Sequence, residues 1–537
     1  SNNQPSGNDT DLDDQALTYQ TRIEQRELQL LQLSGRHTFL ETPWLSEVAR
    51  NIALQNLEFD WFYSDSEVTT DIPNQTTFQG GALLDPVTGA ELSTSLFAST
   101  SMGQFSFLNL KDNQTSYGGN FALPVQLDSA ALTLTAGWWG AQKDRDYRGY
   151  NVNLNAVGVL SQYREGGPAE VLTPANLTVD HGFDISLGSQ FGTESYLAAQ
   201  SIDAGYGMLD LDFNNRWRFT AGARYEDYRQ TVLPVDLLDF TGQSIRNLQQ
   251  QLADPNQTLA IAEDEFFGSA ALTYMSDGLF GSDEYQIRVS LGETIVRPDL
   301  REVADVTYID PELNVRVGGN PNLISSPIDN FEVRGEFFYG TGDNFTVSLF
   351  MKAIEAPIEQ VRQPGSDDDF KLTFENALSG EVSGIEFEGL KRLPAGFFVT
   401  GNLTLSDSQV QLDPESPNNL TNYTRRMTGH SEWVVNATLG YDSDNGRHSA
   451  YLNFNSFGER IYSAGTDNHD DVYEQPFDSL GIVYKFFPTE RIELQLKVDN
   501  ILDEKRELTQ VSSSGEMADV LVQDVGASFS LGGRWTF

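Results

Sequence analysis

The C-terminal stretch ASFSLGGRWTF, from Ala527 to Phe537, alternates apolar and polar positions. Its apolar positions of one parity are Phe529, Leu531, Trp535 and Phe537. Because successive side chains of a β-strand point to opposite faces, this pattern predicts a strand with one apolar and one polar face. A closing strand that ends on an aromatic residue is typical of a membrane barrel, where aromatic side chains form girdles at the bilayer interfaces.

The same alternation recurs in EWVVNATLGY (residues 432–441) and RIELQLKVDN (residues 491–500). Charged side chains at successive positions of one face need water, because a dry core imposes a large desolvation penalty on them. The strand candidates are also longer than the ~5–6 residues that are typical of soluble sheets. These features favour a barrel with one face toward lipid. The predicted lipid-facing residues are Trp433, Val435, Leu439, Leu494, Leu496, Phe529, Trp535 and Phe537.

Short turns and long polar loops alternate between the strand candidates, and the segment from Val68 to Gly103 is expected to be one of these loops. The turns fall near Asn214, Pro394, Asn445 and Pro488, and we expect them on one rim. The loops that contain Asn320, Glu415 and Asp470 are expected on the other rim. This asymmetry is typical of outer-membrane barrels, which have short periplasmic turns and long extracellular loops.

The chain contains about seventeen strand candidates, whereas single-chain bacterial barrels have an even number of strands. We therefore expect an incomplete wall, with residues 21–39 at one edge and residues 526–537 at the other. A missing segment or a separate chain is expected to complete it, because unpaired backbone groups in hydrocarbon are costly. Residues 1–20 are predicted to be a polar acidic leader or loop, and residues 21–537 the partial barrel.

Composition narrows the class of protein further. The 34 basic and 78 acidic residues give a formal net charge of −44, which makes nucleic acid an unsuitable partner. The absence of cysteine excludes disulfides and thiolate chemistry. No run of about 18 apolar residues marks a transmembrane helix. The fold class predicted from these observations is an all-β, antiparallel transmembrane barrel.

The central run from Glu293 to Tyr339 contains an Arg-Pro pair at the end of a strand, an Asn-Pro-Asn-Leu turn, and a strand with Asn and Glu. Together with ENALSGEVSGIEFEG, LKVDNILDEKREL and the terminal RWTF, this order resembles the TonB-dependent outer-membrane receptors. The resemblance covers residues 284–537 by motif and the earlier half by strand pattern. It implies a 22-stranded family barrel that is filled by a plug domain.

The resemblance also implies a receptor in the outer membrane of a Gram-negative bacterium, in contact with membrane lipid and lipopolysaccharide. Such a receptor imports a scarce nutrient (a siderophore, glycan, peptide or vitamin) with energy from the inner-membrane TonB complex. A plug and a TonB box are not found before Thr21, so contact with TonB is expected through an N-terminal region absent from this sequence. The alternative is a passive porin-like barrel or a channel for secretion or assembly.

No enzymatic site is predicted, because the five histidines are scattered and none has metalloenzyme spacing. The acidic cluster Asp467, His469, Asp470 and Asp471 contains oxygen ligands of the kind that Ca²⁺ prefers. A solvated extracellular loop is the preferred interpretation, so no cofactor is expected, and Ca²⁺ in the loops is the alternative. Three carboxylates are predicted to face the lumen as weak candidates for a transport path: Glu386, Glu388 and Asp499.

Overall fold

A computed structural model describes the chain over most of its length. The described residues are 2–4, 14–39, 53–54, 57–84, 90–187, 195–235, 259–309, 316–340, 342–364, 370–416, 420–466, 469–511, 515 and 517–536. Within them, the few helices are one turn long, and none is long and apolar enough to cross a membrane.

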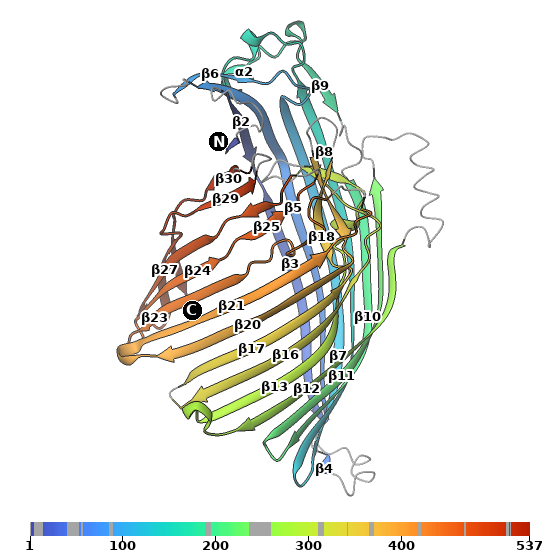
Figure 1. The fold of residues 1–537 in the computed structure, drawn as a ribbon, viewed down its shortest axis with the longest axis vertical. Helices are drawn as coiled ribbons and strands as arrows, with labels where there is room; N and C mark the ends of the chain where they lie inside the picture. The colour runs from blue at the N-terminus through green and yellow to red at the C-terminus, as the bar shows by residue number, and fades with distance from the viewer. Residues whose placement is uncertain are drawn as a thin grey trace.

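One curved antiparallel sheet, here called the wall, makes up most of the molecule (Figure 1). Each of its long strands pairs with the next long strand along the chain. In order they are β5 (Leu57–Leu84), β7 (Gly103–Gln126), β8 (Ala130–Asn155), β10 (Ser195–Phe213), β11 (Trp217–Val235), β12 (Leu259–Ser276), β13 (Glu284–Val296), β16 (Ser326–Tyr339), β17 (Asp343–Glu355), β20 (Ser379–Arg392), β21 (Phe397–Gln411), β23 (Trp433–Asp442), β24 (His448–Phe457), β27 (Phe477–Thr489), β28 (Ile492–Asp499) and β31 (Ser528–Trp535).

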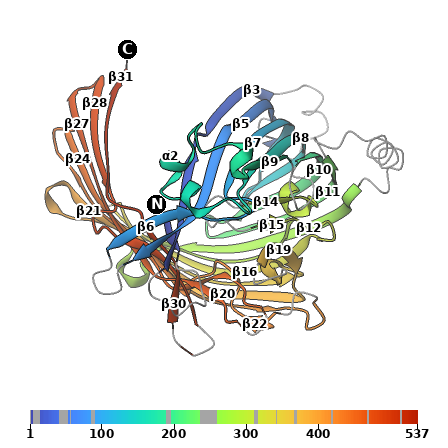
Figure 2. The ribbon, with the colours of Figure 1, turned by 90° about the horizontal axis from the view of Figure 1, so that it is seen from above.

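The N-terminal edge of the wall is formed by β2 (Asp14–Arg22) and β3 (Gln25–Phe39), which pair in succession with β5. Counting β2 and β3 as one position gives seventeen positions among the described residues, in agreement with the sequence-based count of about seventeen strands. No backbone pairing joins β3 to β31 in the described part of the chain, and Figure 2 shows these two strands apart. The predicted open wall and both of its edges are confirmed.

One boundary differs from the prediction. The residues expected to form a leader already contribute β1 (Asn2–Gln4), which pairs with β2, and β2 begins at Asp14. The segment from Val68 to Gly103, expected to be a loop, also continues β5 to Leu84. Polar residues on both faces hid this part of the strand from the alternation pattern. The strand is defined here by its backbone, which pairs with β2 and β7.

The pairing registers place the side chains of the wall on two chemically different faces. One row of directly opposed residues runs Leu439, Leu452, Ile482, Val498 and Phe529, from β23 to β31. Four of these five large apolar side chains are exposed, all except Val498. A wide exposed apolar surface of this kind marks a contact with another apolar medium. We call it the apolar face.

The polar face carries the residues of the other parity. One row across seven neighbouring strands consists of Arg218, Thr273, Arg288, Arg334, Ser348, Glu386 and Thr404. Toward the C-terminus, Asn436 donates to Asn402 (2.8 Å) and Lys485 pairs with Glu493 (3.0 Å) on the same face. Polar groups thus satisfy one another across strands, as the predicted wet lumen requires.

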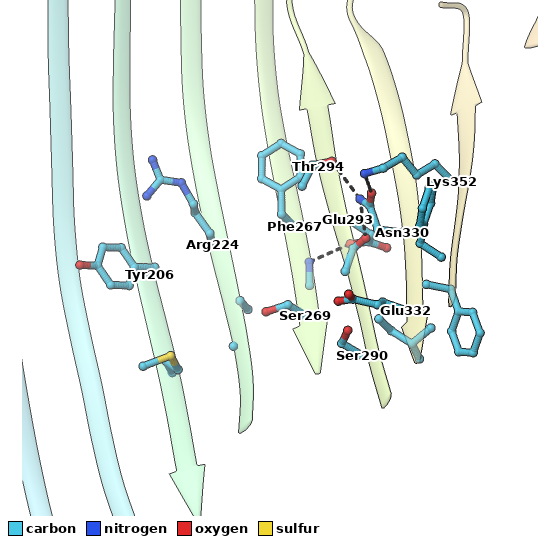
Figure 3. Close-up of a pocket in the computed structure, with 18 of the residues that line it drawn as sticks. Tyr206, Arg224, Phe267, Ser269, Ser290, Glu293, Thr294, Asn330, Glu332 and Lys352 are labelled. Atoms are coloured by element: carbon cyan, nitrogen blue, oxygen red, sulfur yellow. Dashed lines mark hydrogen bonds between the residues drawn. The ribbon is translucent and has the colours of Figure 1, made fainter. Parts of the chain in front are cut away.

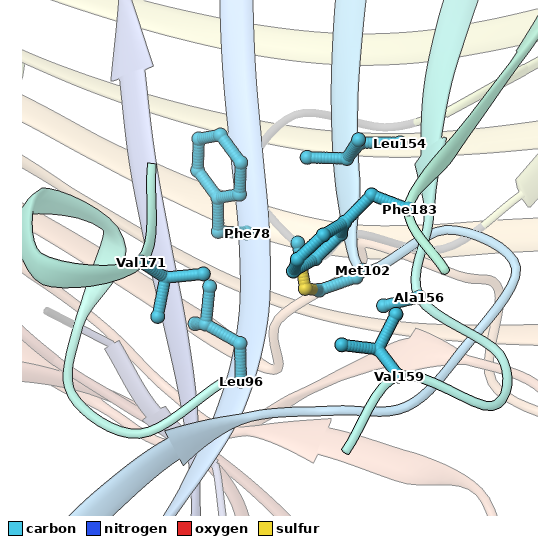
Figure 4. Packing of buried hydrophobic residues seen from close by; sticks show 8 residues of the cluster. All are labelled: Phe78, Leu96, Met102, Leu154, Ala156, Val159, Val171 and Phe183. Atoms are coloured by element: carbon cyan, nitrogen blue, oxygen red, sulfur yellow. The ribbon is translucent and has the colours of Figure 1, made fainter. Parts of the chain in front are cut away.

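The N-terminal strands extend beyond the rest of the wall and carry a small apolar core (Figure 4). Its buried residues come from β5, β8, the β5–β7 connection and the β8–β10 connection: Phe78, Leu96, Met102, Leu154, Ala156, Val159, Val171 and Phe183. The connecting elements are β6 (Glu91–Leu96), η1 (Ser161–Tyr163), α2 (Pro168–Val171), η2 (Val179–His181) and β9 (Asp184–Leu187). This core makes the long loop region a compact unit of its own.

Two small sheets are built from other loops of the same rim. The first contains β14 (Thr307–Ile309), β15 (Arg316–Gly318), β18 (Ile358–Pro364) and β19 (Phe370–Asn376). The second contains β25 (Arg460–Ser463), β26 (Val472–Glu474), β29 (Lys505–Val511) and β30 (Met517–Asp524). The remaining short elements are β4 (Ala53–Leu54), β22 (Thr424–Arg425), α5 (Leu300–Val303), η3 (Leu279–Gly281) and η4 (Pro394–Gly396).

Because neighbouring strands alternate in direction, the turns near Asn214, Pro394, Asn445 and Pro488 lie at one end of the wall, and the loops that contain Asn320, Glu415 and Asp470 lie at the other, as predicted. Asn214 and Asn215 make the β10–β11 turn with positive φ angles of 54° and 52°, and η4 makes the β20–β21 turn. Pro488 lies at the end of β27, next to the short connection to β28. The amide of Thr536 donates to Arg491 O (2.9 Å), which places the end of β31 on the rim of short turns.

We expect Leu496→Arg to destabilise the protein folded in lipid, by up to about 2–4 kcal/mol if Leu496 lies near the bilayer midplane and by less toward an interface. The matched control is Gln495→Arg, which adds the same charge to the polar face of the same strand. Urea titration of both variants refolded into phospholipid vesicles measures the difference. Equal stability of the two variants would show that the faces are wrongly assigned.

Candidate functional site

The long β13–β16 connection folds back onto the wall, and we call its described residues, 297–309 and 316–325, the inner loop. In the view from above, its strands β14 and β15, together with β19, lie inside the curve of the wall (Figure 2). Its polar contacts are with Glu226 and Glu263, and Glu226 shares parity with Arg218 on β11. The polar face is therefore the inner face of the wall, and the apolar face is the outer one.

Arg297 anchors the start of the inner loop to three residues of the wall. Its Nη1 donates to Glu226 Oε2 (2.7 Å), and its Nε lies 3.7 Å from Glu263 Oε2. The guanidinium carbon lies 4.3 Å from the ring centroid of Tyr228. Only 13% of the Arg297 side chain is exposed, so removing one partner would leave a charge buried without compensation. This anchor accounts structurally for the Arg-Pro pair in the sequence.

The next two residues continue the attachment. The Pro298 carbonyl accepts from Nε2 of the fully buried Gln230 (3.2 Å). Asp299 caps α5 by accepting from the amide of Arg301 (2.9 Å), and its carboxylate also faces Arg145 Nη1 at 3.4 Å. A side-chain oxygen that accepts a free amide at a helix N-terminus stabilises the helix by about 1 kcal/mol.

Arg145 is held for this contact by a bidentate pair with Asp112, in which two N–H groups donate at 2.8 Å each. Such paired hydrogen bonds fix the plane of the guanidinium. Below the charged contacts, the apolar side of the inner loop packs on β8 and β10. The buried residues of that core cluster are Tyr147, Tyr196, Ala198, Leu300, Ala304 and Val306.

The capping of α5 is reciprocal. Glu302 Oε2 accepts from the Asp299 amide (2.8 Å). Burial raises the pKa of Glu302, and this amide donor opposes the rise only in part. The short helix is therefore defined by side chains of its own first turn, which are the acidic residues that its sequence places there.

Asn320, the first Asn of the Asn-Pro-Asn-Leu motif, joins the inner loop to the β18–β19 hairpin. Its amide donates to Glu302 O (2.6 Å) and its Nδ2 donates to Phe374 O (2.8 Å). The preceding Gly319 is packed so closely that a Cβ there would meet Ala304 O at 2.0 Å. The loop ends at Ser325, whose hydroxyl donates to Glu263 (2.8 Å). Glu263 thus contacts both ends of the inner loop.

A hollow of about 990 Å³ lies against the wall between β8 and β20. Figure 3 shows Tyr206, Arg224, Phe267, Glu332 and Lys352 projecting from neighbouring strands around it. The Arg224 guanidinium lies 5.4 Å from the Trp139 ring and 5.9 Å from the Tyr206 ring, and Arg224 also pairs with Glu226 at 2.6 Å. The surface combines aromatic faces with charges of both signs, which suits a polar solute of mixed character.

The predicted lumen carboxylates occupy the inner face, where each has a polar partner. On β20, Glu386 accepts from Thr404 (3.3 Å) and Glu388 accepts from Arg334 (3.3 Å). Asp499 pairs with Lys497 (2.9 Å) on β28, several strands away. The structure therefore brings Glu386 and Glu388 together but separates Asp499 from them. Their role in transport stays a prediction.

The acidic cluster considered for Ca²⁺ is held largely by hydrogen bonds. Asp467 lies outside the described residues, and His469 is exposed. The buried Asp471 accepts from the Gly465 amide (2.7 Å) and from Asn422 (3.1 Å), and Asp470 accepts from the same Asn422. Across the described ranges, no group of three or more His, Asp or Glu side chains is placed to hold a metal ion.

Seven of the eight residues predicted to face lipid lie on the outer face. Five of the eight are exposed large apolar side chains, and Trp433 and Val435 are partly covered. The eighth, Phe537, lies outside the described residues. Of the adjacent pair Trp138 and Trp139, Trp138 lies on the outer face beside Phe59 and Phe121, whereas Trp139 turns inward to Arg224. Contact with lipid stays a prediction for all eight.

Sequence reasoning missed two buried ion clusters in the small sheets. Glu359 and Arg425 pair at 2.9 Å with 2% and 3% of their side chains exposed, and Thr428 donates to the same carboxylate. In the second sheet, Glu474 accepts from Arg460 (2.6 Å) and Arg506 (2.7 Å). The partners are up to 69 residues apart in sequence, so no local spacing could reveal them.

Burial alone would raise the pKa of Glu474, but the hydrogen bonds from Arg460 and Arg506 outweigh it and lower that pKa below the ordinary value. For Arg362 in β18, burial lowers the pKa to about 10, and the charge of Asp471 opposes this shift. The two small sheets therefore depend on charged groups that were removed from water and then paired.

Comparison with known families gives an extended match. A family model described as "TonB dependent receptor-like, beta-barrel" matches residues 1–501. No curated protein sequence matches the chain significantly.

Several solved structures are similar in fold. The copper transporter OprC is 12% identical, with coverage of 98% of this chain and 70% of that one and a TM-score of 0.53. The ferric-catecholate import receptor Fiu from K12 E. coli is 11% identical, with coverage of 98% and 74% and a TM-score of 0.52. The ferric citrate transporter FecA in the unliganded form is 10% identical, with coverage of 97% and 70% and a TM-score of 0.50.

We expect Arg297→Gln to loosen the inner loop from the wall, because Glu226 and Glu263 lose the cation between them. Breaking a buried pair typically costs about 3–5 kcal/mol. Amide hydrogen exchange should then become at least tenfold faster in residues 299–306 while β28 stays protected. The control Arg218→Gln removes an inner-face arginine far from the loop and should leave residues 299–306 unchanged. Unchanged exchange in Arg297→Gln would contradict the anchor.

Because the pKa of Glu474 is lowered in the folded protein, its pairing stabilises the second small sheet above the ordinary Glu pKa of about 4.3 and that stabilisation is lost as the pH falls below it. We expect the amides of β26 and β29 to lose protection between about pH 4.5 and pH 2.5. Hydrogen exchange followed over this range measures the loss. In Glu474→Gln the local protection should be lower at pH 7 and much less sensitive to pH, and an unaltered profile would refute the assignment.

Proposed function

Since the chain belongs to the TonB-dependent receptor β-barrel family, we propose that it imports a scarce nutrient with energy supplied through TonB. Its place is the outer membrane of Gram-negative bacteria, where the proteins of this family reside. The family consists of receptors and transporters, and we propose no enzymatic role for this chain. The observation that carries the proposal is the inner loop, which is anchored to the polar inner face and lies inside the curve of the wall (Figure 2).

A loop fixed inside the curve of the wall favours active import over passive diffusion. The inner loop is fixed by Arg297, Gln230, Glu263 and a buried apolar cluster, so its displacement would break several contacts at once. A solute that passes such a layer needs either another route around it or an energy supply that moves part of the interior. The passive channel therefore remains the second candidate.

The substrate class is a further proposal. The solved structures of similar fold are named for transport of copper, a ferric catecholate and ferric citrate. We therefore test metal chelates first, ahead of glycans, peptides and vitamins. The inner hollow supports this choice in a general way, because Arg224 and Lys352 offer cationic donors and Trp139 and Phe267 offer aromatic surface to an anionic chelate.

The experiment measures uptake of ⁵⁵Fe bound to citrate or to a catecholate, and of copper, by host cells that carry the full receptor. The comparison is between cells with and without functional TonB, each with and without the receptor gene. We expect saturable uptake of one chelate that requires both the receptor and TonB. Receptor-dependent uptake that persists without TonB and rises linearly with concentration would support the passive channel instead.

We also propose that strands from outside this sequence complete the wall. The edge strands β3 and β31 run in the same direction, so an antiparallel closure needs an odd number of additional strands between them. Unpaired backbone groups in hydrocarbon cost several kcal/mol each. In the receptor isolated from outer membranes, the amides of β31 should therefore exchange as slowly as those of β28. Fast exchange along β31 would contradict a closed barrel.

A further inference from the structure

A groove crosses the outer face of the wall where three neighbouring strands carry small residues. Gly389 of β20 is directly opposite Gly401 of β21, and Gly401 is directly opposite Ala437 of β23. These strands lie side by side in Figure 1. Because the three positions lack large side chains, a hollow of about 630 Å³ remains over them. It is separate from the inner hollow, since its floor belongs to the other face of the wall.

The sides of the groove are apolar. Phe387, Leu403 and Val435 form a row along one side, each two residues from a floor residue on its own strand. Phe345 closes one end, opposite Gly389, and 42% of its surface is exposed. Ala437 lies between Val435 and Leu439 on the outer face, which in this family meets the membrane. The groove therefore opens toward hydrocarbon and not toward water.

A lysine side chain lies beside the groove, on the side of the short turns. Lys391 follows Gly389 by two residues, is directly opposite Val399, and exposes 69% of its side chain on the outer face. The turn at Pro394–Gly396 begins three residues later, which puts the ammonium group near the membrane interface. A lysine on a lipid-facing surface extends its ammonium group toward the polar headgroups.

Lys391 has donors left for a ligand. Its ammonium group donates to Asp343, whose other carboxylate oxygen accepts from the Arg392 amide at 2.8 Å. An ammonium group carries three N–H donors, so the bond to Asp343 leaves two. Tyr339 also lines this part of the groove, and its phenol is a further polar group at the same rim. An anionic oxygen ligand complements these groups, whereas an apolar ligand would leave them unused.

We propose that this groove is a binding site for one phospholipid of the leaflet next to the short turns. One acyl chain lies over Gly389, Gly401 and Ala437, and the phosphate accepts from Lys391 and faces Tyr339. The acyl chain contacts the row of small residues and lies between Phe345 and the row Phe387, Leu403 and Val435. The site does not depend on the imported substrate, because its residues lie on the opposite face from the inner loop.

Gly389→Leu tests the acyl part of the site. A Cβ at Gly389 would meet no heavy atom closer than 3.5 Å, so the side chain can occupy the groove without displacing backbone. Gly401 is unsuitable because its Cβ would meet Asn436 O at 2.5 Å. The matched control is Gly205→Leu, which adds the same side chain on the outer face at a place with nothing within 4 Å. Lys391→Gln tests the headgroup part and leaves the groove unfilled.

The full receptor is extracted from outer membranes in mild detergent, and native mass spectrometry counts the phospholipids that stay bound. Phosphatidylglycerol is then added back to delipidated protein. We expect one retained phospholipid in the wild type and in Gly205→Leu, at least tenfold lower occupancy in Gly389→Leu, and at least threefold weaker rebinding in Lys391→Gln. Heat-dependent gel mobility checks that each variant is folded.

Three results would overturn the site. Equal phospholipid occupancy in the wild type, Gly389→Leu and Lys391→Gln would show that the groove holds no specific lipid. A wild-type dimer that Gly389→Leu converts to a monomer would assign the groove to a second copy of the chain. If Gly389→Leu does not fold, the Lys391→Gln result decides, and unchanged rebinding of phosphatidylglycerol by that variant would refute the headgroup contact.

Discussion

The requirement that every backbone N–H and C=O in a lipid environment finds a partner governs this molecule. A sheet meets the requirement only by pairing each strand on both sides, so the wall extends strand by strand with registers that contain few irregularities. The alternation of side chains then divides the sheet into two faces with different solvents. The outer face exposes large apolar residues such as Leu439 and Leu496, which a protein surrounded by water would bury.

The inner face differs from the outer one because its side chains are charged and polar. Its charged side chains are too numerous for a dry interior, and the structure pairs them across strands and with the inner loop. Arg297 illustrates the principle, because its cation is set between Glu226 and Glu263 and against the Tyr228 ring. Charges in such a place stabilise the structure only when paired, so they fix one arrangement of the loop against the wall. The contacts of Gln230 and Asp299 fix the same arrangement independently.

The loops on the long-connection rim are structured domains and not merely links. One contains a true apolar core around Phe78, Leu96 and Met102, and the two small sheets contain the buried pairs Glu359–Arg425 and Glu474–Arg460. The net charge of −44 is thus compatible with ordered loops, because the buried Glu359 and Glu474 are each paired with arginine. On this rim the receptor presents an ordered surface, and the wall supports that surface. The geometry of the wall is independent of the loops that form the surface.

The sequence by itself determined the strands, their faces, the two rims and the odd number of strand positions, because alternation and turn residues act locally along each strand. It also located the Arg-Pro pair and Asn320, although not what they contact. Only the tertiary structure decided that Arg297 meets Glu226 and Glu263, that Asn320 joins α5 to β19, and that Arg224 meets the Trp139 ring. These contacts join residues far apart in the chain, and their partners follow from strand order and register. The long polar part of β5 was missed for a related reason: its few apolar residues do not alternate regularly with polar ones, and backbone pairing with β2 and β7 defines the strand.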